Sequence, residues 1–247
     1  MQTKNKKPGL IVFMVLAILV IFSNSCKKDT DVSSLETGTL TDIDGNIYKT
    51  VKIGGTWWMA ENLKVKRYSS GDSIKYINST APDSAWSKLV TGAYCYFDWK
   101  YGYLYNFFTI ADSRGIAPAG WHIPTDQEWQ EMELFLGMNK DDAEKMNWRG
   151  EDQGNRLKIT GGNTVDWAKS DDEYSIFGTN ESGFAAVGGA CRMFNGEWGE
   201  ITHTTFWWTS SMSENNAWYR GLDYNKKNVF RYYGLRNYGF SIRCVKD

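Results

Sequence analysis

The chain has 247 residues, of which 42% are apolar and 23% charged, a balance typical of one folded globular domain and not of a disordered chain. The formal net charge is −1 and the sequence contains no basic stripe, which argues against a nucleic-acid partner. Aromatic residues are abundant, with 12 Trp, 14 Tyr and 12 Phe, and their large rings suit both hydrophobic cores and contact surfaces.

The first 25 residues have the order of a secretory signal peptide. Lys4, Lys6 and Lys7 precede an apolar run from Leu10 to Phe22, and the small polar residues 23–25 follow. The apolar run has 13 residues, whereas a helix that crosses a bilayer needs roughly 20. We therefore predict a cleaved signal peptide over residues 1–25, with an uncleaved membrane anchor as the alternative.

Cys26 directly follows this segment. A Cys after a small residue resembles the lipobox of bacterial lipoproteins, whose thiol is acylated and becomes the mature N-terminus. The charged residues 27–31 resemble a surface-export signal of lipoproteins from Bacteroidetes-type bacteria. The resemblance implies lipidation at Cys26 and a place in the cell envelope, at the outer membrane and facing the cell surface. Residues 26–38 are polar and lack periodicity, so we expect a flexible tether there.

We expect one folded domain over residues 39–247. The stretches 40–43 and 46–53 flank Asp44-Gly45, a strong hairpin signal because both turn positions tolerate a positive φ. A second turn at Gly54-Gly55 leads into residues 57–59, which predicts a three-stranded meander. Two further strands are expected over 92–97 and 101–110.

The clearest helix is predicted to begin at Thr125, where Thr125 and Glu128 have the spacing of a capping box. Trp129, Met132 and Leu136 recur at helical spacing before Gly137. A weaker helix is expected over 140–148. Beyond Gly183 the pattern returns to strands, predicted over 184–187, 190–194, 206–210, 217–224, 229–233 and 240–245. This order predicts an α+β fold with many short antiparallel strands, one clear helix and one weaker helix.

Several blocks of the sequence together resemble the Fibrobacter succinogenes major paralogous domain, a family of lipoproteins and surface proteins. The blocks are residues 41–46, 58–63, 101–106, 120–125, 128–129, 180–184, 207–211, 217–220 and 239–245. The Gly-Trp-x-x-Pro-Thr-x-x-Glu-Trp block at Gly120 and the Gly-Phe-x-x-Arg block at Gly239 are also similar to the sulfatase-modifying-factor branch of the C-type lectin fold. This resemblance implies a C-type-lectin-like domain with its termini close together, but it implies no particular reaction.

Besides Cys26, the chain has Cys95, Cys191 and Cys244, an odd number for an oxidising compartment. We predict one disulfide and one free thiol. Cys95 and Cys244 are the favoured pair, because both lie in strand-like blocks typical of the family, and Cys191 with Cys244 is the second choice. Three buried, reduced thiols are the remaining alternative, since free Cys is commonly buried.

No catalytic residue is predicted. The related formylglycine-generating enzymes use two cysteines close together near the C-terminus, and Cys244 has no such neighbour. The only histidines, His122 and His203, are too few for a three-His metal site. Residues 42–46 look like the start of a calcium loop, but the rest of the EF-hand spacing is missing. We therefore predict no cofactor, and calcium has no motif to support it.

Aromatic and arginine residues alternate in the C-terminal strands, where one face should be buried and the other displayed. The binding candidates on these strands are Trp207, Trp208, Trp218, Tyr219, Arg220 and Arg231. The sequence favours a membrane-anchored binding or interaction module for a glycan or a surface protein over an enzyme. The alternatives are an enzyme related to the formylglycine-generating enzymes and a structural component of the envelope.

Overall fold

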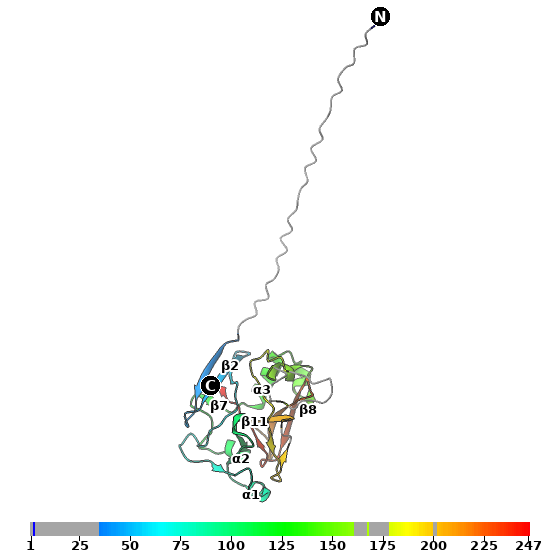
Figure 1. The fold of residues 1–247 in the computed structure, drawn as a ribbon. Helices are drawn as coiled ribbons and strands as arrows, with labels where there is room; N and C mark the ends of the chain where they lie inside the picture. The colour runs from blue at the N-terminus through cyan, green and yellow to red at the C-terminus, as the bar shows by residue number, and fades with distance from the viewer. Residues whose placement is uncertain (1, 3–34, 161–166, 168–177, 200–201) are drawn as a thin grey trace. The chain divides into compact units, whose positions relative to one another are not determined.

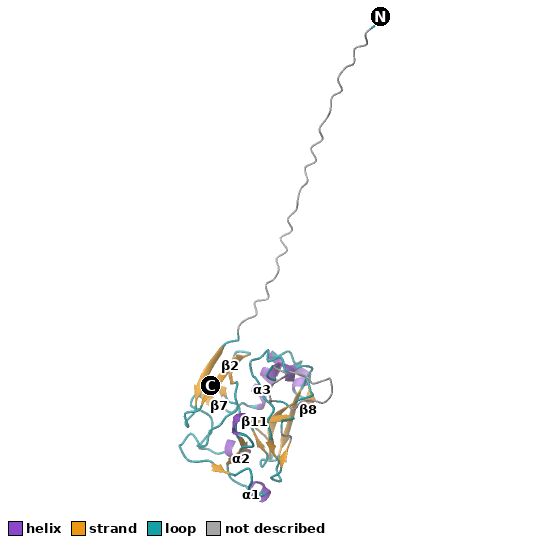
Figure 2. Ribbon diagram, in the orientation of Figure 1, coloured by secondary structure: helices purple, strands orange, loops and turns teal. Residues whose placement is uncertain are grey.

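The computed structural model describes residue 2 and residues 35–160, 167, 178–199 and 202–247 (Figure 1). Leu35–Asp247 form one compact unit. As Figure 2 shows, this unit consists mostly of strands and loops, and the helices that the structure describes are short. The α+β class predicted from the sequence is confirmed at this level, as a set of largely antiparallel sheets with five short α-helices in the described residues.

The helices are α1 (Asp83–Ser87), α2 (Phe107–Ile110), α3 (Asp126–Phe135), α4 (Lys140–Ala143) and α5 (Gln153–Leu157), together with the 3₁₀ turn η1 (Trp99–Tyr101). Within the described part of the chain, no helix has the length and apolar character needed to cross a membrane.

Three sheets organise the strands. The five-stranded sheet has the order β1 (Thr37–Thr41), β2 (Ile47–Ile53), β3 (Thr56–Met59), β15 (Val245–Lys246), β7 (Trp121–His122). The six-stranded sheet has the order β10 (Trp198–Gly199), β9 (Cys191–Arg192), β14 (Gly239–Phe240), β6 (Leu104–Asn106), β5 (Ala93–Cys95), β4 (Lys75–Tyr76). The four-stranded sheet has the order β11 (Thr204–Ser213), β12 (Asn216–Asp223), β13 (Val229–Gly234), β8 (Asn147–Arg149). The described strand pairs are antiparallel except β4 with β5.

The predicted meander is confirmed as β1–β2–β3. Its first turn depends on Gly45, whose φ of 81° lies in the left-handed region that glycine adopts without strain. Asp42 holds the same turn, because its carboxylate accepts hydrogen bonds from the backbone N–H groups of Asp44 and Asn46, both at 2.9 Å. β15 joins this sheet by pairing with β3, so the C-terminus lies beside the N-terminal strands of the unit (Figure 1).

The predicted helix after Thr125 is confirmed as α3. The Thr125 side chain accepts from the backbone N–H of Glu128, and the Glu128 carboxylate accepts from the backbone N–H of Thr125, so the capping box is complete. Trp129 and Met132 are buried on the inner face of this helix.

Several predicted elements differ from the structure. The strand expected over 184–187 is not formed, and Ala186 makes an isolated bridge with Lys158 there. The strand expected over 101–110 ends at Asn106, because the Asn106 side chain accepts from the backbone N–H of Thr109 and thereby caps α2. The weak helix expected over 140–148 ends at Ala143, and Trp148 instead lies in β8, paired with Phe230 of β13. The expectation of one clear and one weaker helix was therefore wrong, since several short helices interrupt the strands.

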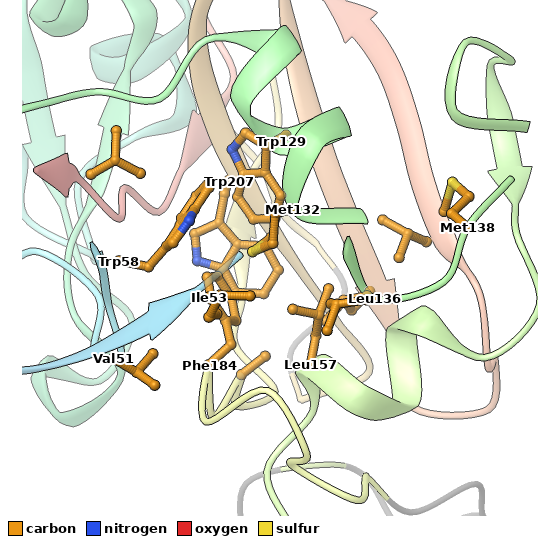
Figure 3. Close-up of a cluster of buried hydrophobic side chains, with 14 of the residues drawn as sticks. Val51, Ile53, Trp58, Trp129, Met132, Leu136, Met138, Leu157, Phe184 and Trp207 are labelled. Carbon is orange, nitrogen blue, oxygen red and sulfur yellow. The ribbon is translucent and has the colours of Figure 1, made fainter. Parts of the chain in front are cut away.

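The largest part of the core is an aromatic cluster where α3 packs between sheets (Figure 3). Trp58 of β3, Trp129 of α3 and Trp207 of β11 meet there with Phe184, and none of these side chains is more than 1% exposed. Their ring centroids are 5.1–6.1 Å apart, mostly in edge-to-face arrangements, which aromatic pairs prefer. This cluster ties the five-stranded sheet to the four-stranded sheet.

A buried ionic network fixes α3 to the four-stranded sheet. Arg220 of β12 donates to Glu133 at 2.9 Å and to Asp126 at 2.6 Å, while Arg231 of β13 donates to Asp126 at 2.7 Å. Arg149 of β8 also donates to Glu133. Three guanidinium groups thus share two carboxylates, and the pairing satisfies charges that could not be buried alone.

We expect this network to make the fold acid-sensitive through Asp126. Burial would raise the pKa of its carboxyl, but hydrogen bonds and charge from Arg231 and Arg220 outweigh burial and lower the pKa to about 2. Because the pKa is lower in the folded chain, the ionised carboxylate stabilises the fold at pH values above its unfolded pKa of about 4. This contribution is lost as the pH falls from about 4 to about 2. Urea unfolding at pH 5 and pH 2.5 should therefore show a steeper loss of stability in the native chain than in Asp126→Asn. An identical pH dependence in the two proteins would contradict this prediction.

Candidate functional site

A pocket with a volume of about 650 Å³ opens beside the β1–β2 hairpin. Its walls come from the start of β1, the middle of β2, the segment after β3, the turn 100–102 and residues between 180 and 187. Arg243, from the segment before β15, also lines it. The volume lies in the range of small-molecule sites, which are usually preformed hollows with a few fixed polar groups.

Arg243 is the most deeply buried charged residue of this lining, with 1% of its surface exposed. Its Nε donates to the Asn62 side-chain oxygen at 2.8 Å, and its two terminal nitrogens donate to the carbonyls of Phe184 and Ala185. Each of these acceptors is neutral. Burial lowers the pKa of Arg243 to about 9, and the charge of Glu61 opposes this effect only in part. The guanidinium therefore carries its positive charge into the pocket lining without a directly bonded carboxylate among the described residues.

Asn62 connects the pocket to the aromatic core. Its side-chain oxygen also accepts from the indole N–H of Trp207 at 2.9 Å, and its amide donates to the Tyr101 carbonyl at 2.8 Å. Only glycine at position 102 lets the turn 100–102 pack this closely against Asn62. A Cβ there would lie 2.5 Å from the Asn62 Cβ, and the φ of Gly102 is +89°. Arg243 is thus held in position by Asn62, which is itself held by the buried Trp207 of the aromatic core.

The mouth of the pocket carries further positive charge. Lys49 and Lys100 are exposed, Lys64 is half-buried, and Glu61 is the single acidic residue among those that line the pocket. Glu61 accepts from the backbone N–H of Lys49 at 2.6 Å. Four basic residues therefore face one carboxylate, in a protein whose overall charge is close to zero.

The predicted binding residues lie elsewhere, on the four-stranded sheet. Trp207, Trp208 and Arg220 have no exposed surface and Arg231 is 7% exposed, which corrects the expectation that these side chains form a displayed surface. The physical reason is that α3 and the aromatic core cover both faces of β11 and β12 at these positions. Trp218 and Tyr219 are half-buried, and the guanidinium of Arg231 lies 3.9 Å from the Trp218 ring centroid.

The disulfide prediction was wrong. Cys95, Cys191 and Cys244 are buried, the described residues contain no disulfide between them, and each belongs to a different hydrophobic cluster. Neither Cys95–Cys244 nor Cys191–Cys244 forms, because all three thiols are packed as small apolar groups. Burial raises the pKa of Cys95 to about 12 and raises that of Cys244 further.

These thiols are expected to be inert in the native protein. A thiol reagent at pH 8 should leave Cys244 unmodified, as mapped by mass spectrometry, because the reactive species is the thiolate and burial disfavours it. The same reagent in urea should modify Cys244 fully, which serves as the control. Rapid native labelling of Cys244 would instead favour the enzyme alternative related to formylglycine-generating enzymes.

His122 forms a second polar cluster, at the beginning of α3. Its Nδ1 lies 2.7 Å from an Asp247 oxygen and its Nε2 lies 2.8 Å from a Glu128 oxygen. Burial would lower the pKa of His122, but the two carboxylates outweigh it and raise the pKa. His122 thus links α3 to the C-terminus. In the described parts of the chain, no group of three or more His, Cys, Asp or Glu residues is arranged to hold a metal ion.

Sequence reasoning missed the pocket, although Asn62 and Arg243 both lie in blocks that carry the family resemblance.

Neither the curated proteins nor the solved structures contain a match to this chain. The pattern of the Fibrobacter succinogenes major domain matches residues 51–246, which include most of the pocket and the whole aromatic core. The chain therefore belongs to the Fibrobacter succinogenes major domain family.

Proposed function

We propose that this protein is a lipid-anchored binding module of the cell envelope and that the pocket beside the β1–β2 hairpin is its ligand site. The preformed hollow of about 650 Å³ is the observation that carries the proposal. Its polar groups are held in place before a ligand arrives, since Asn62 and Arg243 are fixed by hydrogen bonds to one another and to the core. Such preorganisation reduces the ordering cost of binding.

The anchor in this proposal is Cys26, whose thiol is acylated before residues 1–25 are removed, with residues 26–38 as the tether. The support is the order of the basic, apolar and small residues before that Cys. The proposed location is the outer membrane, with the domain facing the cell surface. Metabolic palmitate labelling should be lost in Cys26→Ala, and labelling that persists in this variant would remove the anchor from the proposal.

We further propose that the domain has a C-type-lectin-like fold. Two features support this. The first and last strands of the described unit, β1 and β15, lie in one sheet, so the termini of the unit are close. The loops are long and the helices short around small antiparallel sheets.

In this proposal, a glycan is the favoured ligand over a surface protein, because a pocket of this size encloses a few sugar units and offers little area for a protein partner.

A substitution that fills the pocket tests the proposed site. Thr37 is exposed on β1 and lines the pocket, so Thr37→Trp should block the hollow without disturbing the core. The matched control is Thr41→Trp, which lies at the exposed other end of the same strand and outside this pocket. With the full-length chain in detergent on a glycan array, we expect binding to be lost in Thr37→Trp and kept in Thr41→Trp. Equal binding by both variants would place the site elsewhere.

A further inference from the structure

We propose that the pocket recognises a carboxylate-bearing saccharide, of the uronic-acid type, through Arg243 and the three lysines at its mouth. This inference rests on the proposed function, since it assigns a ligand class to the same site.

The charge of the lining is strongly asymmetric. Lys49, Lys64, Lys100 and Arg243 line the pocket together with one carboxylate, that of Glu61. The whole chain has 28 basic and 29 acidic residues, so this excess is local. A hollow with walls of low dielectric concentrates such a potential and attracts anions.

The innermost cation lacks a direct anionic partner. Arg243 donates to the Asn62 oxygen and to two backbone carbonyls, and the described residues supply no carboxylate within ion-pair distance of it. A buried charge without a counter-charge is costly, and a ligand carboxylate in the pocket would reduce that cost. Because Arg243 is 1% exposed and each of its nitrogens already donates within the protein, it attracts the ligand carboxylate through its charge and not through a direct hydrogen bond.

The outer cations can exchange partners at little cost. Lys100 contacts Asp98 at 3.4 Å in an exposed pair, and exposed pairs contribute little to stability. Its ammonium lies 4.6 Å from the ring centroid of Tyr101. Lys64 lies 5.8 Å from the Tyr48 ring centroid. These contacts keep the ammonium groups near the mouth of the pocket while leaving them accessible to an anion.

The uncharged groups favour a sugar acid over a bare inorganic anion. Val51, Ile159 and Val187 form an apolar part of the wall, whereas Thr50 and Asn180 supply polar side chains. A pyranose ring has apolar C–H faces and a rim of hydroxyl groups, so it can use both kinds of wall at once. Inorganic phosphate would use the cations alone, and a fatty acid would leave the polar groups without a partner.

The test compares trigalacturonate with its methyl ester, which has the same rings and no charge. Isothermal titration of the full-length chain in detergent should show binding of the acid and at least tenfold weaker binding of the ester. The variant Lys49→Gln/Lys64→Gln/Lys100→Gln should bind the acid roughly 10- to 100-fold more weakly, since three partly exposed ion pairs would be lost.

The matched control is Lys75→Gln/Lys88→Gln/Lys246→Gln, in which three exposed lysines outside the pocket lose the same total charge. This control should bind trigalacturonate like the native chain.

Equal loss in both triple variants, equal binding of acid and ester, or no binding of the acid would overturn the proposal. If neutral glycans bind and Thr37→Trp blocks them, the proposed function stands while the sugar-acid ligand is rejected. If Thr37→Trp leaves trigalacturonate binding intact, the site itself is wrong.

Discussion

Replacement of Glu133 by Ala is expected to lower the free energy of unfolding by about 3–5 kcal/mol, because it leaves the buried guanidinium of Arg149 without its carboxylate and leaves Arg220 with Asp126 as its remaining one. Glu133, Arg149 and Arg220 are 0%, 3% and 0% exposed, so water cannot replace the lost partner. For a domain of this size the melting temperature should fall by about 6–20 °C. Urea unfolding of the full-length chain, followed by Trp fluorescence, measures this change.

Two control variants test separately the position of the residue on α3 and the negative charge of Glu133. Glu131 lies on the same helix and is exposed, so Glu131→Ala should change the free energy of unfolding by no more than about 0.5 kcal/mol. Glu133→Gln keeps the shape of the side chain and can still accept hydrogen bonds, so its loss should be smaller than that of Glu133→Ala. If Glu133→Ala proves as stable as Glu131→Ala, the network does not hold α3 to the sheet.

The C-terminal strands show what the sequence could and could not predict. The alternation around Arg220 and Arg231 correctly indicated strands, because side chains on a strand alternate between faces. It could not show which face is displayed, since that depends on what packs against the sheet. The carboxylates that bury these arginines, Asp126 and Glu133, lie about 90 residues earlier in the chain and carry no local signal of their role.

The pocket was beyond sequence reasoning for the same reason. Arg243 meets Asn62 and the carbonyls of residues 184 and 185, which are 58–181 positions away along the chain. The lysines at its mouth look like ordinary solvated charges in the sequence. Local patterns therefore predicted the hairpin at Gly45 and the capping box at Thr125, whose interactions span only a few residues, but not a site assembled by long-range contacts.

Trp207→Ala is the second large expected effect, a loss of about 3–5 kcal/mol in the free energy of unfolding. The indole is completely buried and packs against Trp129 and Phe184, so its removal leaves a cavity at the centre of the aromatic cluster (Figure 3). It also deprives the Asn62 oxygen of one of its two donors. Thermal or urea unfolding of the full-length chain provides the measurement, with Trp99→Ala as the control.

Trp99 is 65% exposed, so its replacement should change stability by no more than about 0.5 kcal/mol. Trp207→Phe distinguishes the two contributions of the indole, because it retains a ring in the cluster and removes the N–H that Asn62 accepts. We expect it to be more stable than Trp207→Ala, yet to bind a pocket ligand more weakly than the native chain, since Asn62 then orients Arg243 without support from the core. If Trp207→Phe binds as the native chain does, Asn62 holds Arg243 independently of the core.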